Sequence, residues 1–117
     1  MGGMVAAAAR CGPQVNPQDL QVVEVEVPIA GLPRRLDGLR IVQLSDLHLS
    51  AVVSLAHVQH AVSIAQSLAG ELIVLTGDYV TRGEDGVVTC AQALARLHAP
   101  LGVYATLGNH DYWSDAT

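Results

Sequence analysis

Aromatic residues are nearly missing from this sequence of 117 residues, which has no Phe, one Trp and three Tyr. A surface that binds single-stranded nucleic acid stacks bases on several aromatic rings, so we do not expect such a surface here. Basic residues are also few: 6 Lys and Arg stand against 11 Asp and Glu, and the formal net charge is −5. Binding to a nucleic-acid backbone relies on a basic stripe. The composition therefore argues against a nucleic-acid-binding protein.

Cysteine is scarce as well. Cys11 and Cys90 are too few for a disulfide scaffold, and their spacing matches no zinc-binding motif. The N-terminus has a short apolar stretch without a basic region before it, which makes a poor secretory signal. We interpret the chain as a protein of a reducing compartment and expect a cytoplasmic location, with attachment to a membrane surface as the alternative.

Between Ser50 and Gly70 the sequence has no Asp, Glu, Lys or Arg. The length of this uncharged segment comes close to what spans a bilayer. Polar side chains interrupt it, however, and they would carry unpaired polar groups into lipid. These residues are His57, Gln59, His60, Ser63, Gln66 and Ser67. We therefore expect a buried amphipathic helix in place of a membrane span.

Half of the residues are hydrophobic, a composition that favours a buried core over disorder. Residues 1–20 lack periodicity, so we expect a mobile leader, followed by the folded part of the chain over residues 21–117. Val and Glu alternate from Val23 to Val27, which predicts a half-exposed strand.

Hydrophobic periodicity in the rest of the chain predicts three strands that alternate with two helices. The expected ranges are 39–45 (strand), 53–69 (helix), 71–76 (strand), 87–98 (helix) and 102–107 (strand). Gly70 is the expected C-cap of the first helix. The strand at 71–76 is apolar on both faces, as in parallel sheets that are covered on both sides. Right-handed crossovers make the strands of such a βαβαβ unit parallel, so we predict an α/β fold with a ligand site at the carboxyl edge of the sheet.

Polar residues follow each predicted strand at that edge. They are Asp46 and His48 after the first strand, Asp78 after the second, and Asn109, His110 and Asp111 after the third. Asp46 and His48 are two residues apart, so an extended segment would point both side chains to one metal ion. Mixed oxygen and nitrogen ligation suits Mn, Fe or Zn better than Mg or Ca.

A second ion is expected beside the first. Asp78 has two carboxylate oxygens and can bridge two ions, while Asn109 can add a neutral oxygen. Gly77 and Gly108 allow tight turns at the strand ends and leave room for the ions and a substrate. Two ions about 3.5–4 Å apart can activate water and clamp a phosphate for in-line attack. Because the ions set the local charge, an acidic chain can bind an anionic substrate.

Three segments now carry a family resemblance: SDLHLS at 45–50, LTGDYVTR at 75–82 and GNHDYW at 108–113. They resemble the first three motifs of the calcineurin-like metallophosphoesterases, in the same order and each at the end of a strand. The segment VEVPIAGLPRRLDGLRIVQLSDLH is especially similar to the bacterial subgroup typified by YkuE and YaeI. The resemblance implies a four-layer αββα sandwich, of which this βαβαβ unit would form the first half.

The resemblance also implies roles for the polar residues. Asp46 and His48 would bind the first metal ion, Asp78 would bridge both ions, and Asn109 would bind the second. His110 would contact the phosphate and protonate the leaving group, and Asp111 would orient the His110 imidazole. The implied reaction is hydrolysis of a phosphomonoester or phosphodiester with two divalent ions, and the subgroup leaves a lipid-linked or nucleotide-sugar phosphate open as substrate.

The sequence departs from the family pattern in two ways. Thr81 stands at the second acidic position of the GDxxD motif, and no His follows His110, although the family takes further ligands from an isolated His and a GHxH motif. We therefore expect a partial sequence whose first ion has three protein ligands and whose second has two. Weak metal binding, little turnover and self-association through an uncovered apolar sheet face would follow.

Two alternatives stay open. The chain could be a non-catalytic metal-binding or interaction half-domain that keeps half of a site, or a half-site that another chain completes. A further pair, His57 and His60, lies three residues apart on the first predicted helix, but no third ligand is evident, so we interpret both as ordinary residues of a helix face.

Overall fold

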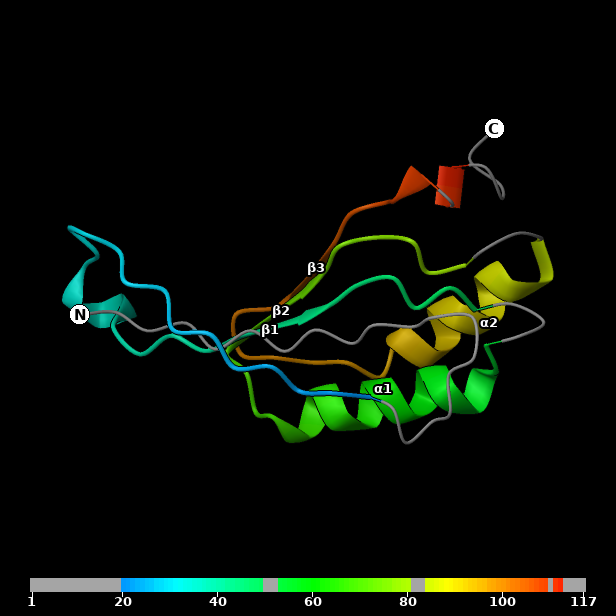
Figure 1. Cartoon of the computed structure of the whole chain (residues 1–117), viewed down its shortest axis with the longest axis horizontal. Coiled ribbons are helices and arrows are strands. Elements are labelled where there is room, and N and C mark those ends of the chain that lie inside the picture. The colour runs from blue at the N-terminus through cyan, green and yellow to red at the C-terminus, as the bar shows by residue number, and fades with distance from the viewer. Residues whose placement is uncertain (1–19, 50–52, 81–83, 110, 113–117) are drawn as a thin grey trace.

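The computed structural model of the chain describes residues 20–49, 53–80, 84–109 and 111–112. Except for Leu20, the predicted leader therefore lies outside the described residues. The elements follow each other as η2 (Arg34–Leu36, a 3-10 helix), β1 (Ile41–Leu44), α1 (Leu55–Ser67), β2 (Leu72–Leu75), α2 (Glu84–Leu94) and β3 (Val103–Ala105) (Figure 1).

The three strands form one parallel sheet in the order β1-β2-β3. Ile41 pairs with Leu72 and Ile73 pairs with Val103, which sets the register of the two ladders. Figure 1 shows α1 and α2 on the same side of this sheet. The predicted βαβαβ unit is thus confirmed, although each strand is shorter than the hydrophobic pattern indicated.

The strand predicted over 23–27 is wrong. These residues form no strand, and Val23, Val25 and Val27 are each more than a third exposed. A strand needs a neighbour to accept and donate its backbone hydrogen bonds. The described residues supply no such neighbour to this segment, so the period-2 pattern alone does not produce a strand.

Helix α1 has a side-chain cap at its N-terminus and is followed by a residue with positive φ. The Ser54 hydroxyl accepts a hydrogen bond from the backbone N–H of His57, as an N-cap does. At the other end Ala69, rather than the predicted Gly70, adopts a positive φ of 51°. Glycine at position 70 has another role. A Cβ there would lie 2.6 Å from Cγ2 of Val42, so a side chain at this position would clash with β1.

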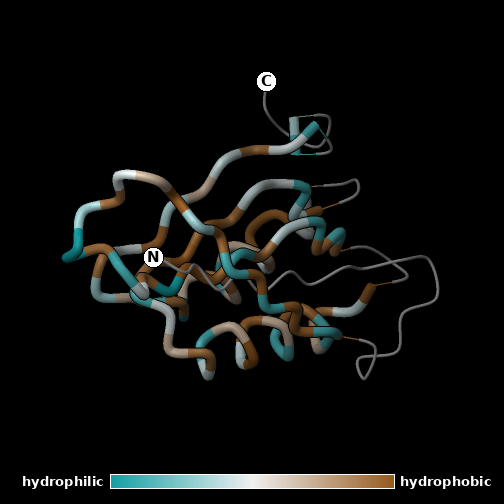
Figure 2. Tube along the Cα trace, turned by 60° about the vertical axis from the view of Figure 1, so that its left-hand side comes forward, coloured by the Kyte–Doolittle hydropathy of each residue, from teal (hydrophilic) through white to brown (hydrophobic). Residues whose placement is uncertain are grey.

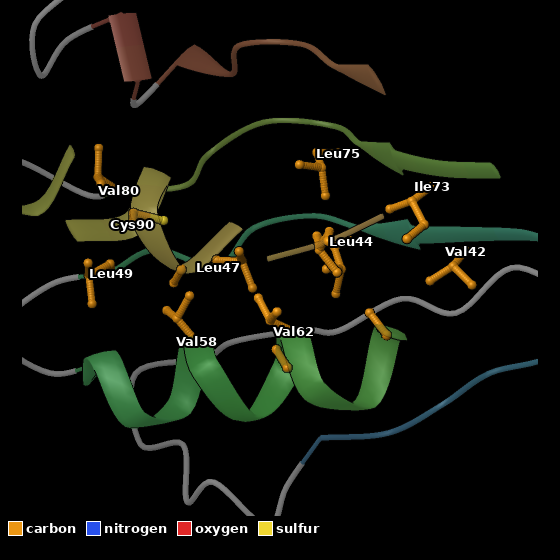
Figure 3. Packing of buried hydrophobic residues seen from close by; sticks show 14 residues of the cluster. Val42, Leu44, Leu47, Leu49, Val58, Val62, Ile73, Leu75, Val80 and Cys90 are labelled. Carbon is orange, nitrogen blue, oxygen red and sulfur yellow. The ribbon is translucent and has the colours of Figure 1, made fainter. Parts of the chain in front are cut away.

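The core lies between the sheet and the two helices. Alternate strand residues, among them Val42, Leu44, Ile73 and Leu75, are buried, and Figure 3 shows their side chains directed at α1. Val58, Val62 and Ala65 form a buried stripe on α1 that belongs to the same core, in agreement with the predicted amphipathic helix. Figure 2 shows the hydrophobic stretches running through the middle of the molecule.

The second face of the sheet differs from the expectation. The sequence at 71–76 predicted cover on both sides, but Leu72 and Val74 on the face away from the helices are only half-buried. The described residues place both helices on one face, because three strands in sequential order that are joined by crossovers of one hand put every crossover on the same side.

The loops after β1 and β2 stay hydrogen-bonded to each other beyond the ends of the strands. The backbone N–H groups of Asp46, His48 and Leu49 donate to the carbonyls of Gly77, Asp78 and Tyr79, at 3.1, 3.0 and 2.9 Å. A parallel bridge between Leu49 and Val80 continues this pairing. Backbone hydrogen bonds between the two loops therefore hold the polar residues at the carboxyl edge in place.

Candidate metal centre

Asp46, His48 and Asp78 come together at the carboxyl edge of β1 and β2, and we call them the Asp–His–Asp cluster. One ligand atom from each residue lies within 4.8 Å of the others. The Nε2 atom of His48 is 3.4 Å from Oδ1 of Asp46 and 3.9 Å from Oδ2 of Asp78. The structure thus brings together three of the four residues predicted to bind metal in the arrangement of a potential single site.

The backbone of this cluster is not extended as predicted. Asp46, His48 and Asp78 have positive φ angles of 57°, 49° and 53°, a region that non-glycine residues rarely adopt. The side chains of Asp46 and His48 still converge, with Nε2 of His48 3.4 Å from Oδ1 of Asp46. Leu47 between them is fully buried, so the loop is anchored in the core. Backbone strain of this kind concentrates at functional sites, where the surrounding structure holds it in place.

The two carboxylates of the cluster differ in exposure. The Asp46 side chain is 53% exposed and that of Asp78 is 16% exposed. The Ser45 hydroxyl donates to Oδ2 of Asp46 at 2.6 Å, which turns Oδ1 toward His48. Asp78 is therefore the inner carboxylate of the cluster, and Asp46 is the solvent-exposed one.

Asn109, the fourth predicted ligand, lies next to Asp78. With its side-chain amide nitrogen facing the carboxylate, Asn109 donates to Oδ2 and Oδ1 of Asp78 at 3.2 and 3.3 Å. Asn109 itself is exposed. The pair that was predicted to share the second ion is therefore in contact, as hydrogen-bond donor and acceptor.

Gly77 and Gly108 let the ends of β2 and β3 meet backbone to backbone. A Cβ on Gly77 would lie 2.5 Å from the backbone nitrogen of Gly108, and a Cβ on Gly108 would lie 2.5 Å from that of Asp78. Real Cβ atoms essentially never come so close to backbone atoms. Glycine is thus required at both positions for close approach, in addition to the positive φ of 103° at Gly77.

Asp111 makes contacts that the sequence reasoning did not anticipate. Its buried carboxylate accepts hydrogen bonds from the backbone N–H groups of Asp78, Tyr79 and Gly108, each at 2.8 Å, and from that of Val80 at 3.3 Å. The predicted role of Asp111, to orient the His110 imidazole, is not tested because His110 lies outside the described residues. The spacing from Gly108 to Asp111 is that of a capping box, and this signal could have predicted one of the four contacts.

Tyr79, in the loop that follows β2, and Cys90 of α2 are in contact: the Cys90 thiol lies 3.6 Å from the carbonyl oxygen of Tyr79. The Tyr79 hydroxyl is 2.9 Å from the carbonyl oxygen of Leu75 and 2.6 Å from that of Thr106, so it joins β2 to the end of β3. Burial raises the pKa of Tyr79 above its ordinary value. Burial, together with the charge of Asp111, raises the pKa of the Cys90 thiol from 9.0 to about 11. Cys90 is 1% exposed and belongs to the hydrophobic core.

The two helix histidines do not form a second site. His57 is buried and His60 is exposed. In the part of the chain that the structure describes, the Asp–His–Asp cluster is the only group of three or more His, Cys, Asp or Glu residues with converging ligand atoms. The same part of the chain contains no helix with the length and hydrophobicity of a membrane span.

Comparison with known proteins identifies relatives of the chain. It is 44% identical over 85 residues to the UDP-2,3-diacylglucosamine pyrophosphatase LpxG of Chlamydia trachomatis. The match covers 69% of this chain and 26% of LpxG. It is 37% identical over 97 residues to a zebrafish (Danio rerio) protein named transmembrane protein with metallophosphoesterase domain, covering 83% of this chain and 22% of the relative. The Bacillus subtilis metallophosphoesterase YkuE is 29% identical over 100 residues, covering 84% of this chain and 35% of YkuE.

The chain spans between about a fifth and a third of the length of these curated relatives. No solved structure matches it. The profile of the calcineurin-like phosphoesterases matches residues 39–117, which include β1, β2, β3 and the whole Asp–His–Asp cluster. With this match over most of its length, the chain belongs to the calcineurin-like phosphoesterase family.

Proposed function

We propose that the Asp–His–Asp cluster binds a divalent metal ion and that the protein hydrolyses phosphate esters at this centre. The observation that carries the proposal is the convergence of two carboxylates and one imidazole within 4.8 Å at the carboxyl edge of a parallel sheet. The donor set fits a metal of the Mn, Fe or Zn type, because it mixes oxygen and nitrogen ligands.

Asp78 and Asn109 support a second ion beside the first. Oδ2 of Asp78 faces both His48 and Asn109, and Oδ1 of Asp78 faces Asn109. Both oxygens of this carboxylate are therefore directed at residues of the proposed site. Binding of a second ion would require the Asn109 amide to turn its oxygen, instead of its nitrogen, toward the Asp78 side. Metal ions of this kind take four or more ligands, so donors besides these residues must complete both shells.

The chemistry that bound divalent ions supply is Lewis-acid polarisation of a phosphoryl oxygen and activation of water at neutral pH. The residues of this chain provide the frame for it. Asp78 is the less exposed carboxylate, and Asp46 is the exposed one, on the side from which a substrate would approach. We propose that His110, next to Asn109 in the sequence, donates the proton to the leaving group.

The names of the relatives narrow the class of substrate. LpxG is named a pyrophosphatase of a nucleotide-linked diacyl sugar, and it shares 44% identity with this chain. We therefore propose a phosphate diester or pyrophosphate joined to a sugar or lipid as the substrate class, with simple monoesters as the alternative.

The test is metal binding by the wild-type chain and by His48→Ala, measured by calorimetric titration with Mn²⁺ and by elemental analysis. Loss of one ligand should weaken binding by at least about tenfold. His60→Ala is the matched control, because His60 is an exposed histidine of α1 outside the cluster. Equal metal affinity in wild type and His48→Ala would refute the proposed centre.

Hydrolysis is measured separately, with bis-p-nitrophenyl phosphate and p-nitrophenyl phosphate in the presence of Mn²⁺. Turnover that needs both His48 and added metal supports a phosphoesterase. Metal binding without turnover would favour one of the two alternatives, a non-catalytic half-domain or a half-site that another chain completes.

A further inference from the structure

We propose that Asp111 is a positioning residue for Asp78: its carboxylate fixes the backbone that presents the Asp78 side chain to the metal. This inference rests on the proposed function, since it assigns Asp78 to the metal centre. It concerns the carboxylate of Asp111 and the backbone from Asp78 to Val80, which are joined by hydrogen bonds over more than 30 residues of sequence.

Both oxygens of Asp111 are used. Oδ1 accepts from the N–H groups of Tyr79 and Val80, and Oδ2 accepts from those of Asp78 and Gly108. A carboxylate is the side chain suited to this task, because it has only acceptors and can take several N–H donors at once. Its charge also strengthens each of these bonds relative to a neutral acceptor.

The loop after β2 needs such an acceptor because of its own shape. Gly77 and Asp78 both have positive φ, 103° and 53°, so the chain leaves the sheet ladder in a tight bend. Successive N–H groups in such a bend point into one concavity that attracts an anion. Buried N–H groups without a partner are costly, and Asp111 fills this concavity from the β3 side.

The same bend sets the direction of the Asp78 side chain. Asp78 contacts His48 on one side and Asn109 on the other, and the Gly108 backbone lies too close for Asp78 to move freely. Oδ2 of Asp111 accepts hydrogen bonds from the N–H groups of both Asp78 and Gly108. Asp111 therefore links the loop after β2 to the loop after β3. Loss of Asp111 should therefore disturb the metal centre without removing a ligand.

The experiment compares Asp111→Asn with the wild-type chain in calorimetric titration with Zn²⁺ or Mn²⁺ and in amide hydrogen exchange without metal. Asn keeps one acceptor oxygen and places an NH₂ group against N–H donors. We expect a loss of metal affinity of about tenfold, as for other residues that orient ligands, and faster exchange at Asp78, Tyr79 and Val80. Unchanged exchange at these three amides would overturn the proposal.

A double-mutant cycle shows whether Asp111 acts through Asp78. If it does, Asp111→Asn lowers metal affinity in the wild-type background but not in the Asp78→Asn background. An equal loss in both backgrounds would overturn the proposal. Val58→Ala is the control for simple destabilisation: Val58 lies in the core on α1, so the substitution should lower stability and leave the metal affinity of the folded chain unchanged.

Two further arms keep the test decisive. If Asp111→Asn does not fold, Asp111→Glu takes its place, because Glu keeps both oxygens and the charge but displaces them by one methylene. Faster exchange at Tyr79 with weaker metal binding supports the proposal, and wild-type values of both overturn it. If the wild-type chain binds no metal, the proposed function fails, while the exchange measurement still decides whether Asp111 holds the loop.

Discussion

Residues with unusual backbone conformations coincide with the residues of the candidate site. In the described part of the chain, positive φ occurs at four non-glycine residues, and Asp46, His48 and Asp78 are three of them. Each such residue costs on the order of 1–3 kcal/mol and persists only where its surroundings hold it. Here the buried Leu47 and the carboxylate of Asp111 contribute to this support. Asp and His are also among the non-glycine residues that adopt positive φ most readily.

Cys90 allows a prediction at the residue scale. Because its pKa is raised from 9.0 to about 11, the thiolate fraction at pH 8 falls by roughly a hundredfold. We expect iodoacetamide to modify Cys90 at least that much more slowly in the folded chain than in urea. The measurement uses the Cys11→Ser variant, in which Cys90 is the only thiol. Rapid modification of the folded variant would contradict the assignment of Cys90 to a dry core.

The same shift predicts a pH dependence of stability. The folded chain holds the Cys90 proton more tightly than the unfolded chain does, so the free energy of unfolding is unaffected by this group below pH 9. It should then decrease as the pH rises from 9 toward 11. Urea unfolding at a series of pH values measures this, and Cys90→Ala should remove the part of the decrease that comes from Cys90.

The loops that follow β2 and β3 are in close backbone contact. There, Gly77 and Gly108 bring the two loops into backbone contact. The Tyr79 hydroxyl links the same two segments, since it lies within hydrogen-bond distance of the carbonyl oxygens of Leu75 and Thr106. The hydrophobic pattern predicted both strands, and the polar motifs predicted that their ends carry the site. That the ends touch through glycine follows from the sheet register, which the pattern of one strand does not contain.

Gly108→Ala tests this junction. The new Cβ would lie 2.5 Å from the backbone nitrogen of Asp78, so the loops must separate. We expect a loss of about 1–3 kcal/mol in the free energy of unfolding, as in overpacked cores, together with weaker Mn²⁺ binding. Urea unfolding and calorimetric titration measure the two effects.

Gly86→Ala is the matched control for this substitution. Gly86 lies in α2, and the nearest atom to its added Cβ is 3.5 Å away, an ordinary contact. Ala should stabilise this helix by up to about 1 kcal/mol. If Gly108→Ala is as stable as Gly86→Ala, the close approach of the two loops is not as the structure has it.

At the scale of the whole molecule, the apolar surface is distributed unevenly. The helices cover one face of the sheet (Figure 1). Tyr104 of β3 pairs with Val74, which places it on the other face, and it is 63% exposed. Leu107, which follows β3, is 54% exposed. An apolar groove of about 480 Å³ also lies beside β3, where Leu75, Ala105 and Leu107 face residues of α2. Exposed apolar surface promotes association.

We therefore expect the 117-residue chain to self-associate, with a mass in static light scattering that rises with protein concentration. Tyr104→Lys should reduce this rise, because it places a charge in the centre of an edge strand. Val88→Lys is the control, since Val88 is 62% exposed but belongs to α2 on the helical side. A constant monomer mass over the concentration series would count against association through the sheet.

The sequence by itself determined the order of the elements, the parallel βαβαβ unit and the residue types at the carboxyl edge. Periodicity and side-chain chemistry are local properties, so these features could be predicted before any contact was known. The family membership was predictable for the same reason, because three short motifs carry it.

Only the tertiary structure decided how those residues are held. The positive φ angles of Asp46, His48 and Asp78 occur where loops from distant parts of the chain meet. Three of the four N–H groups bound by Asp111, those of Asp78, Tyr79 and Val80, lie more than 30 residues from it in the sequence. The failure of the strand at 23–27 has the same origin, since a strand exists only with a neighbour. Hydrogen bonds between distant segments are set by the packing of the whole fold, and no local pattern contains them.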